Sequence, residues 1–251
     1  MNPAELRGRL ADVRARIERA ARRAGRDPAA VRLVAVSKTF PAGFVHAAAE
    51  AGQLDFGENK LQEALPKMDA VRGLMPGGPP LRWHLVGHLQ SNKARKAGAA
   101  FDVVHSIDTP DLLRKVDEAA ALSGHHLDAL VQVDLAGEAT KHGAQERDLA
   151  GIFEAGRSTS HVRLVGLMLL PPAVDEPDAA RPYFRALRDV RSRLLAAGVS
   201  GAMLTELSMG MSHDFEIAVE EGATIVRVGT AIFGARPLTI VESQAGSGPF
   251  S

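Results

Sequence analysis

The sequence VRLVAV at residues 31–36 is a short, nearly continuous apolar run, and Ser37, Lys38 and Thr39 follow it directly. Such a run is typical of a parallel strand that is covered by helices. A helical pattern from about residue 41 to residue 51 comes next, and Gly52 closes it. This unit of one strand followed by one helix indicates how the rest of the chain is organised.

Seven further apolar runs follow, each leading into a helical segment or a short turn. We expect strands at residues 31–36, 54–56, 81–86, 101–106, 127–135, 162–169, 203–207 and 223–228. Helical segments are expected at residues 41–51, 59–75, 91–97, 109–124, 179–197, 212–221 and 230–233. One more helix is expected after the loop at 136–143, and it ends near residue 158. Eight such units predict a single (β/α)8 TIM barrel of the α/β class. A doubly wound open sheet is the alternative, because it has the same alternation.

Residues 1–25 predict an extra N-terminal helix outside the eight units. Asn2 can cap it, Pro3 stands in its first turn and Gly25 can stop it. Because only a short turn follows the eighth strand, we expect this helix to cover the place of a full eighth outer helix. Residues 1–251 would then form one domain, with the barrel core at 31–236 and a flexible tail at 237–251.

The composition excludes several classes of protein. Basic and acidic residues balance at 30 each, so no strong field favours nucleic acid or an anionic membrane as the partner. The chain has no cysteine, which excludes disulfides, a thiolate nucleophile and cysteine-ligated metal. No run approaches the ~18 apolar residues of a membrane helix, and the charged N-terminus does not read as a signal peptide. We therefore expect a cytoplasmic protein, and a monomer.

Lys38 stands where the apolar interior of the predicted barrel meets solvent, at the end that carries barrel active sites. Burial there disfavours the ammonium form, and a neutral amine is what attacks an aldehyde to form a Schiff base. The alternative is a lysine whose stem packs along the strand end while its charge reaches water. Lys38 alone does not decide between them.

The ends of the seventh and eighth predicted strands indicate a phosphate site, because barrels often bind phosphate there. The seventh strand runs into SMGMS at residues 208–212, whose glycine allows close backbone approach and whose hydroxyls can donate. Ser212 is expected to open the next helix. The eighth strand runs into Gly229, Thr230 and Ala231, a second turn of the same kind. Each turn alone also fits an ordinary helix cap beside a glycine.

Arg227 lies between Ile225 and Gly229 in a period-2 pattern that points all three toward the barrel mouth. A guanidinium inside a barrel needs an acceptor. One option is a structural salt bridge to a carboxylate such as Glu206. The other is the pyridine nitrogen of a bound pyridoxal phosphate, a known position for an arginine. The arginine would leave that nitrogen unprotonated, which makes the ring a poorer electron sink.

The histidines do not predict a metal site. His84 and His88 are four residues apart, but they straddle a strand end and Gly87, so they do not share a helical face as zinc ligands would. We expect them to form ordinary hydrogen bonds.

Eight blocks of sequence together resemble one family. They are LVAVSKT (33–39), FGEN (56–59) with Gln62 and Glu63, WHLVG (83–87) with LQSNK (89–93), Ile107 with Asp108, KHG (141–143), GLM (166–168), LSMGMS (207–212) and RVGTAIFG (227–234). The chain resembles the pyridoxal phosphate homeostasis proteins, the YggS-like family, whose barrel is similar to the N-terminal domain of alanine racemase. The matching blocks run through nearly the whole chain.

The resemblance implies pyridoxal 5′-phosphate as the cofactor, held as a Schiff base on Lys38. It implies that Ser212 and Thr230, with neighbouring backbone N–H groups, hold the phosphate and that Arg227 faces the ring nitrogen. Asn59 and His84 would line the site. The full set of expected cofactor-binding residues is Lys38, Asn59, His84, Ser208, Met211, Ser212, Arg227, Gly229 and Thr230.

The resemblance further implies a cofactor handler that stores and delivers pyridoxal phosphate, with apo-enzymes as candidate partners and no catalysis of its own. The alternative is an amino-acid racemase, which needs an acid or base on each face of the Cα. Alanine racemases take the second group, a tyrosine, from another domain. The only tyrosine here, Tyr183, lies in a predicted outer helix, although His84 could substitute. A barrel that binds some other phosphate would leave Lys38 unexplained.

Overall fold

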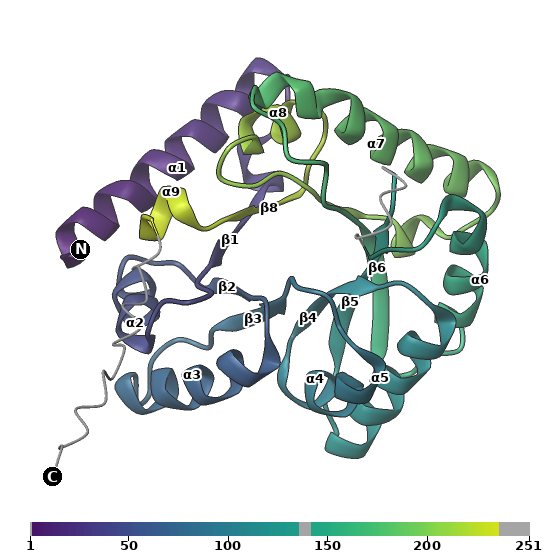
Figure 1. Cartoon of the computed structure of the whole chain (residues 1–251), viewed down its shortest axis with the longest axis horizontal. Coiled ribbons are helices and arrows are strands. Elements are labelled where there is room, and N and C mark those ends of the chain that lie inside the picture. Colours follow the sequence, from purple (N-terminus) through teal and green to yellow (C-terminus); the bar gives the residue numbers. More distant parts are fainter. Residues whose placement is uncertain (1, 136–141, 236–251) are drawn as a thin grey trace, which may run out of the picture.

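The computed structural model describes residues 2–135 and 142–235, which form a closed barrel of parallel strands with helices around it (Figure 1). The strands pair in sequence order, and the last pairs with the first. They are β1 (Arg32–Val36), β2 (Asp55–Glu58), β3 (Arg82–Leu85), β4 (Val103–Ile107), β5 (Leu127–Val133), β6 (Val162–Leu169), β7 (Glu206–Ser208) and β8 (Ile225–Val228). The predicted (β/α)8 barrel is confirmed, and the open sheet is wrong.

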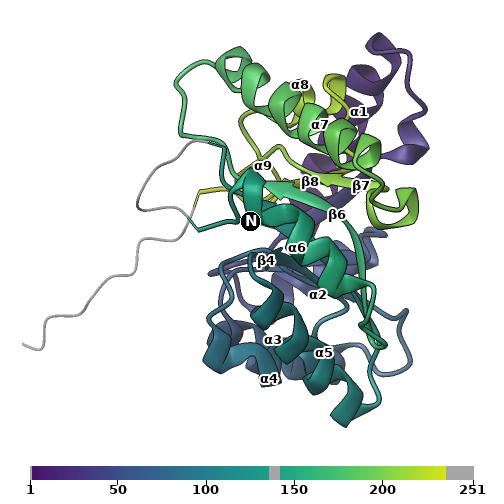
Figure 2. The same ribbon diagram turned by 90° about the vertical axis from the view of Figure 1, so that its right-hand side faces the viewer.

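Helices surround the strands, as the side view shows (Figure 2). They are α1 (Pro3–Arg23), α2 (Ala42–Glu50), α3 (Leu61–Leu74), α4 (Ala94–Ala100), α5 (Pro110–Ser123), α6 (Glu146–Gly156), α7 (Arg181–Ala196), α8 (Phe215–Glu220) and α9 (Thr230–Phe233). None of the described helices combines the length and the hydropathy that a membrane span requires.

Helix α1 closes the outer ring next to β8 and β1 (Figure 1). The Asn2 side chain accepts a hydrogen bond from the backbone N–H of Glu5, and Pro3 opens the helix, as predicted. The helix packs against α2, α8 and α9, and Arg16 reaches Glu216 of α8 at 2.8 Å. Its buried face is apolar at helical spacing: Leu6, Leu10, Val13, Ile17, Ala20 and Ala21. The helix therefore fills the ring position that the short α9 leaves open.

The predicted helix at residues 212–221 begins three residues late. Helix α8 starts at Phe215, and Ser212 does not cap it. The Asp214 carboxylate accepts a hydrogen bond from the backbone N–H of Met211 at 2.6 Å, which fixes a separate turn before the helix. The expectation that Ser212 opens this helix was therefore wrong, because the loop after β7 is folded back toward β8.

The barrel interior has ion pairs at one end and a group of apolar side chains above them. At the end where the strands begin, Asp128 accepts hydrogen bonds from Arg82 at 2.5 Å and from Arg163 at 2.8 Å. Above these ion pairs lies an apolar layer formed by Val34, Val103, Leu130, Val165, Met168 and Ile225. The other end of the barrel, where the strands finish, carries the polar residues singled out from the sequence. The predicted tail at 237–251 and residue 236 lie outside the described residues.

Candidate cofactor site

Lys38 stands in the turn that directly follows β1. Val34 faces the barrel interior, and alternation along the strand puts Lys38 on the same side. Ser37 points the other way, since its Oγ donates to Glu58 Oε1 at 2.7 Å. Lys38 is half-buried. Alternation from Val34 thus puts Lys38 on the side of the barrel mouth.

A buried ionic cluster beneath α3 supports this turn. The Lys67 amine donates to the Ser37 carbonyl oxygen at 2.8 Å, to Glu58 Oε1 at 2.7 Å and to Glu63 Oε1 at 3.0 Å. Glu63 Oε1 also accepts from the backbone N–H of Thr39. Thr39 has a φ of +69° and is the only non-glycine residue with positive φ in the described part of the chain. That conformation is unfavourable for a β-branched residue, so the cluster stabilises a strained backbone conformation beside Lys38.

Sequence reasoning missed this cluster as a unit. Glu58 and Glu63 were seen only as parts of family blocks, and Lys67 was not considered. Its position four residues after Glu63 on a predicted helix was a usable signal. Burial raises the pKa of Glu58, and its hydrogen bond from Lys67 opposes that rise.

Arg227 is a buried cation that no carboxylate of the described residues contacts directly; Asp214 acts on its charge only from beyond ion-pair distance. It is 3% exposed, and its guanidinium donates to Ser208 Oγ at 2.6 Å and to the Leu169 carbonyl oxygen at 2.8 Å. Glu206 instead accepts from the Thr224 hydroxyl at 2.5 Å, so the salt-bridge alternative is wrong. Burial lowers the pKa of Arg227 to about 10, which still leaves it charged at neutral pH. No carboxylate lies within ion-pair distance of it among the described residues.

The turns after β7 and β8 meet through Ser212. Its Oγ accepts hydrogen bonds from the backbone N–H groups of Gly229 at 3.0 Å and, more weakly, of Ala231 at 3.4 Å. Gly210 has a φ of +91°, and a Cβ there would lie 2.5 Å from the Cβ of Ala218. The loop after β7 therefore needs glycine at this point to reach the turn after β8. Backbone N–H groups and hydroxyls of both turns gather beside the buried cation, which fits a ligand that carries phosphate and a ring acceptor.

The other residues expected in the site occupy different depths. Asn59 is half-buried just after β2, where its backbone lies close to Gly87: a Cβ on that glycine would be 2.2 Å from the Asn59 carbonyl oxygen. Thr230 is exposed at the start of α9, and Met211 is 37% exposed. Lys141, part of one family block, lies outside the described residues.

Ser208 and His84 lie deeper than the sequence suggested. Both are fully buried. The Ser208 hydroxyl hydrogen-bonds with Arg227 and with His105 inside the barrel, so it supports the arginine there. Both ring nitrogens of His84 are also engaged, one with His105 and one with Asp55. His84 therefore has no free nitrogen to act as an acid or base at the mouth.

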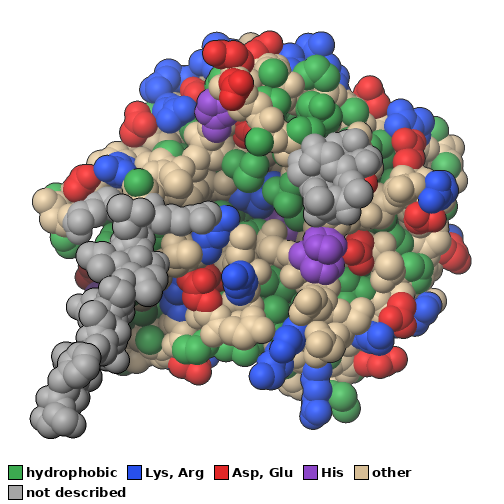
Figure 3. Space-filling model, viewed as in Figure 1, with side chains coloured by type: hydrophobic (Ala, Val, Ile, Leu, Met, Phe, Trp, Pro, Cys, Tyr) green, Lys and Arg blue, Asp and Glu red, His purple; other side chains and the backbone are tan. Residues whose placement is uncertain are grey.

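The face on which the strands end is hollowed near the barrel axis (Figure 3). Lys or Arg side chains, drawn in blue, lie in the hollow, and histidine side chains, drawn in purple, lie beside it. His88 and His142 stack with ring centroids 3.5 Å apart. The mouth thus combines basic and aromatic side chains around an opening. No cluster suited to a metal ion is found within the described ranges.

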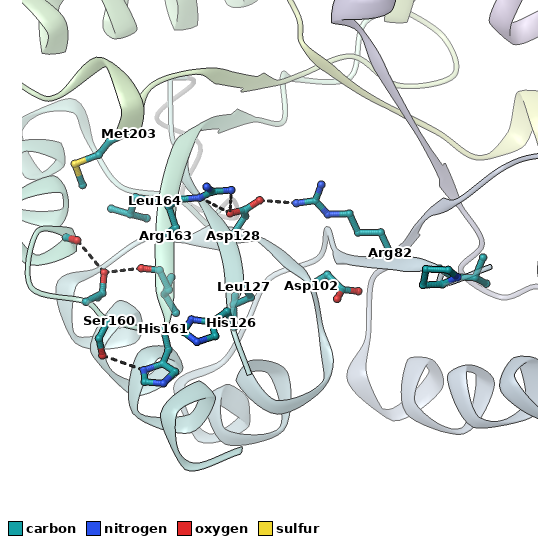
Figure 4. Close-up of a pocket in the computed structure, with 15 residues that line it drawn as sticks. Arg82, Asp102, His126, Leu127, Asp128, Ser160, His161, Arg163, Leu164 and Met203 are labelled. Carbon is teal, nitrogen blue, oxygen red and sulfur yellow. Dashed lines mark hydrogen bonds and ion pairs between the residues drawn. The ribbon is translucent and has the colours of Figure 1, made fainter. Parts of the chain in front are cut away.

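A second pocket, of about 800 Å³, opens at the opposite end of the barrel (Figure 4). Arg82, Asp128 and Arg163 line it but satisfy one another in ion pairs, and His126 stacks on His161 at 4.5 Å. Side chains at this end of a barrel usually serve stability. We therefore assign the candidate site to the mouth and not to this pocket.

Known proteins resemble this chain over most of its length. The family described as "Alanine racemase, N-terminal domain" matches residues 9–237. The pyridoxal phosphate homeostasis protein of Pseudomonas aeruginosa is 45% identical over 227 residues, which cover 90% of this chain and 94% of the relative. That of Aquifex aeolicus is 40% identical over 228 residues, 91% and 97% of the two chains.

The chain belongs to the pyridoxal phosphate homeostasis protein family. A solved structure of PipY from Synechococcus elongatus PCC7942, with PLP bound, matches with a TM-score of 0.79 and 38% identity. The match covers 91% of this chain and all of PipY. The family resemblance drawn from the eight sequence blocks is confirmed.

Proposed function

We propose that this chain binds pyridoxal 5′-phosphate at the barrel mouth, as a Schiff base on Lys38, and serves in homeostasis of that cofactor by storing and delivering it. The observation that carries the proposal is Arg227, a buried cation that makes no direct ion pair with any described carboxylate and stands beside two glycine–hydroxyl turns. The names of the relatives and the PLP bound to PipY support the same ligand.

Each residue then has a distinct part in binding. Ser212, Thr230 and neighbouring backbone N–H groups of the two turns hold the phosphate, as such turns do in other barrels. The N–H groups of Met211 and Gly229 donate here to Asp214 and Ser212, so they must exchange these partners to take part. Arg227 donates to the ring nitrogen and, because its own proton is effectively fixed, leaves that nitrogen unprotonated. Asn59 lines the site. The cofactor, when bound, supplies the aldehyde carbon that the Lys38 amine captures.

The proposed role is storage and not catalysis. Racemisation needs a second acid or base at the reacting carbon. Tyr183 lies in the outer helix α7 and packs against the core there, and both nitrogens of His84 are engaged. We further propose that the chain acts as a monomer in the cytoplasm and that apo-enzymes receive the cofactor from it.

Chemical trapping tests the central claim. We expect wild-type protein incubated with pyridoxal phosphate to show the visible band of a Schiff base, and borohydride to fix the cofactor on Lys38, as read by peptide mass spectrometry. Lys38→Ala should lose the band, whereas Lys60→Ala, a matched change at a neighbouring exposed lysine, should keep it. A Lys38→Ala protein with an undiminished band would refute the assignment.

A chiral assay with alanine and other common amino acids tests the non-catalytic role. We expect no turnover by the wild type. Robust racemisation that disappears in Lys38→Ala would place the protein among the enzymes instead.

A further inference from the structure

A single file of hydrogen bonds crosses the barrel interior from Arg227 to the opposite end. Arg227 donates to Ser208 Oγ at 2.6 Å, and this oxygen lies 2.9 Å from His105 Nδ1. His105 Nε2 lies 2.9 Å from His84 Nδ1, and His84 Nε2 lies 2.9 Å from Asp55 Oδ1. Five side chains from β8, β7, β4, β3 and β2 therefore form one continuous row of hydrogen bonds, called the file below. Each imidazole nitrogen makes one of these bonds.

When both imidazoles are neutral, the carboxylate at one end and the guanidinium at the other fix the direction of every bond in this file. A guanidinium only donates and an ionised carboxylate only accepts. Ser208 must then accept from Arg227 and give its one proton to His105 Nδ1. His105 donates from Nε2 to His84, and His84 donates from Nε2 to Asp55. All the bonds point the same way, and each imidazole carries one proton on Nε2.

Burial supports this assignment. His84 and His105 are fully buried, and desolvation lowers the pKa of His84 and holds that of His105 well below its usual range. Both rings are therefore neutral at physiological pH, as the file requires. Hydrogen bonds in such a file polarise one another, so the rings make Ser208 a better acceptor for Arg227.

We propose that His105 and His84 are positioning residues for the cofactor, which fix the direction and the donor strength of the Arg227 guanidinium through Ser208. The inference rests on the proposed function, because it assumes that Arg227 meets the cofactor ring. Arg227 has two anchors, Ser208 on β7 and the Leu169 carbonyl on β6. Loss of the His105 link weakens one anchor and lets the guanidinium turn away from the mouth.

Three variants of strand β4 separate positioning from general stability. His105→Met removes both ring nitrogens and fills the same space with an apolar side chain of similar size. His105→Gln keeps an acceptor for Ser208 and a donor for His84. Val103→Ala is the control: Val103 faces the same interior on the same strand, is 1% exposed and lies outside the file. Each protein is assayed for pyridoxal phosphate affinity by equilibrium dialysis, for the pH midpoint of its visible band and for thermal unfolding.

We expect His105→Met to bind the cofactor about tenfold more weakly, the scale of one hydrogen bond to a charged group, and to shift the pH midpoint. His105→Gln should restore both to near the wild-type values. Val103→Ala should unfold at a lower temperature with both cofactor readouts unchanged. Asp55 is the last residue of the file, and its side chain is 22% exposed. Asp55→Asn removes the anion that sets the direction of the hydrogen bonds, and it should shift the pH midpoint as His105→Met does.

The outcomes distinguish this inference from the proposed function. If His105→Met and Asp55→Asn both match the wild type in affinity and midpoint, the inference is wrong while trapping on Lys38 stands. The inference also fails if Val103→Ala weakens binding as much as His105→Met, since stability alone would then explain the effect. If His105→Met does not fold, Asp55→Asn and His105→Gln decide. A wild type that binds no cofactor overturns both proposals.

Discussion

Replacement of Lys67 by methionine should destabilise the protein strongly and in a pH-dependent way. The Lys67 side chain is 6% exposed and its partner Glu58 is fully buried. Methionine has a similar length, so packing is largely kept and the charge is what is lost. Removing one partner of a buried ion pair costs roughly 3–5 kcal/mol, because the other charge is left without compensation. We expect a loss of this size in the free energy of unfolding near neutral pH.

The pH dependence follows from Glu58. Burial already raises its pKa, and without Lys67 the pKa rises further. A group whose pKa is higher in the folded than in the unfolded state stabilises the fold below its unfolded pKa, and this contribution is lost as pH rises through the folded value. The penalty of Lys67→Met should therefore be smaller near about pH 5, where only the lost hydrogen bonds to Ser37 and Glu63 remain, and grow toward about pH 8.

Urea unfolding at several pH values measures the effect. The double variant Glu58→Gln with Lys67→Met removes the stranded charge and should recover much of the stability at the higher pH. The reasoning is refuted if the penalty of Lys67→Met is the same at every pH, or if the double variant is as unstable as the single one. Trapping of cofactor by the folded single variant would also fall, because the turn that carries Lys38 loses its support.

Two further changes have matched controls. Gly210→Ala should lower the free energy of unfolding by about 1–3 kcal/mol, because a Cβ at positive φ is strained and would meet Ala218. Gly8 lies in a helix with open space around it, and Gly8→Ala should raise the free energy of unfolding by about 0.5–1 kcal/mol. Thermal unfolding measures both variants, and melting temperatures that shift in the same direction would contradict this expectation. Asp117 accepts backbone N–H groups of residues 160–162, so Asp117→Ala should cost roughly 2–3 kcal/mol in urea unfolding. Asp117→Asn keeps the accepting Oδ1 and should cost clearly less; equal losses would show that the loop does not depend on this oxygen.

The sequence was sufficient for the strands and for the inward direction of Arg227. A strand that is buried shows this in its own run of apolar residues, so it can be recognised without knowing which segments lie beside it. All eight predicted strands overlap the observed ones. The inward position of Arg227 followed from alternation with Ile225, which does lie in the interior layer.

The contacts between distant strands could not be predicted in the same way. His105 meets Ser208 across 103 residues of sequence, and this depends on how the strands are staggered around the barrel. Alternation tells which residues point inward but not which of them lie at one height. For the same reason Ser208 was assigned to the phosphate and His84 to the mouth, although both hydrogen-bond within the interior.

The position of α1 has a consequence for how the protein is made. This helix is synthesised before the strands of the barrel, yet two of its neighbours in the outer ring, α8 and α9, come after most of those strands in the sequence. The ion pair of Arg16 with Glu216 spans 200 residues. Contacts of such separation form late, so the apolar face of α1 stays uncovered on that side until almost all of the barrel has been synthesised. We therefore expect the apolar face of α1 to remain partly uncovered for most of translation, a state that favours aggregation.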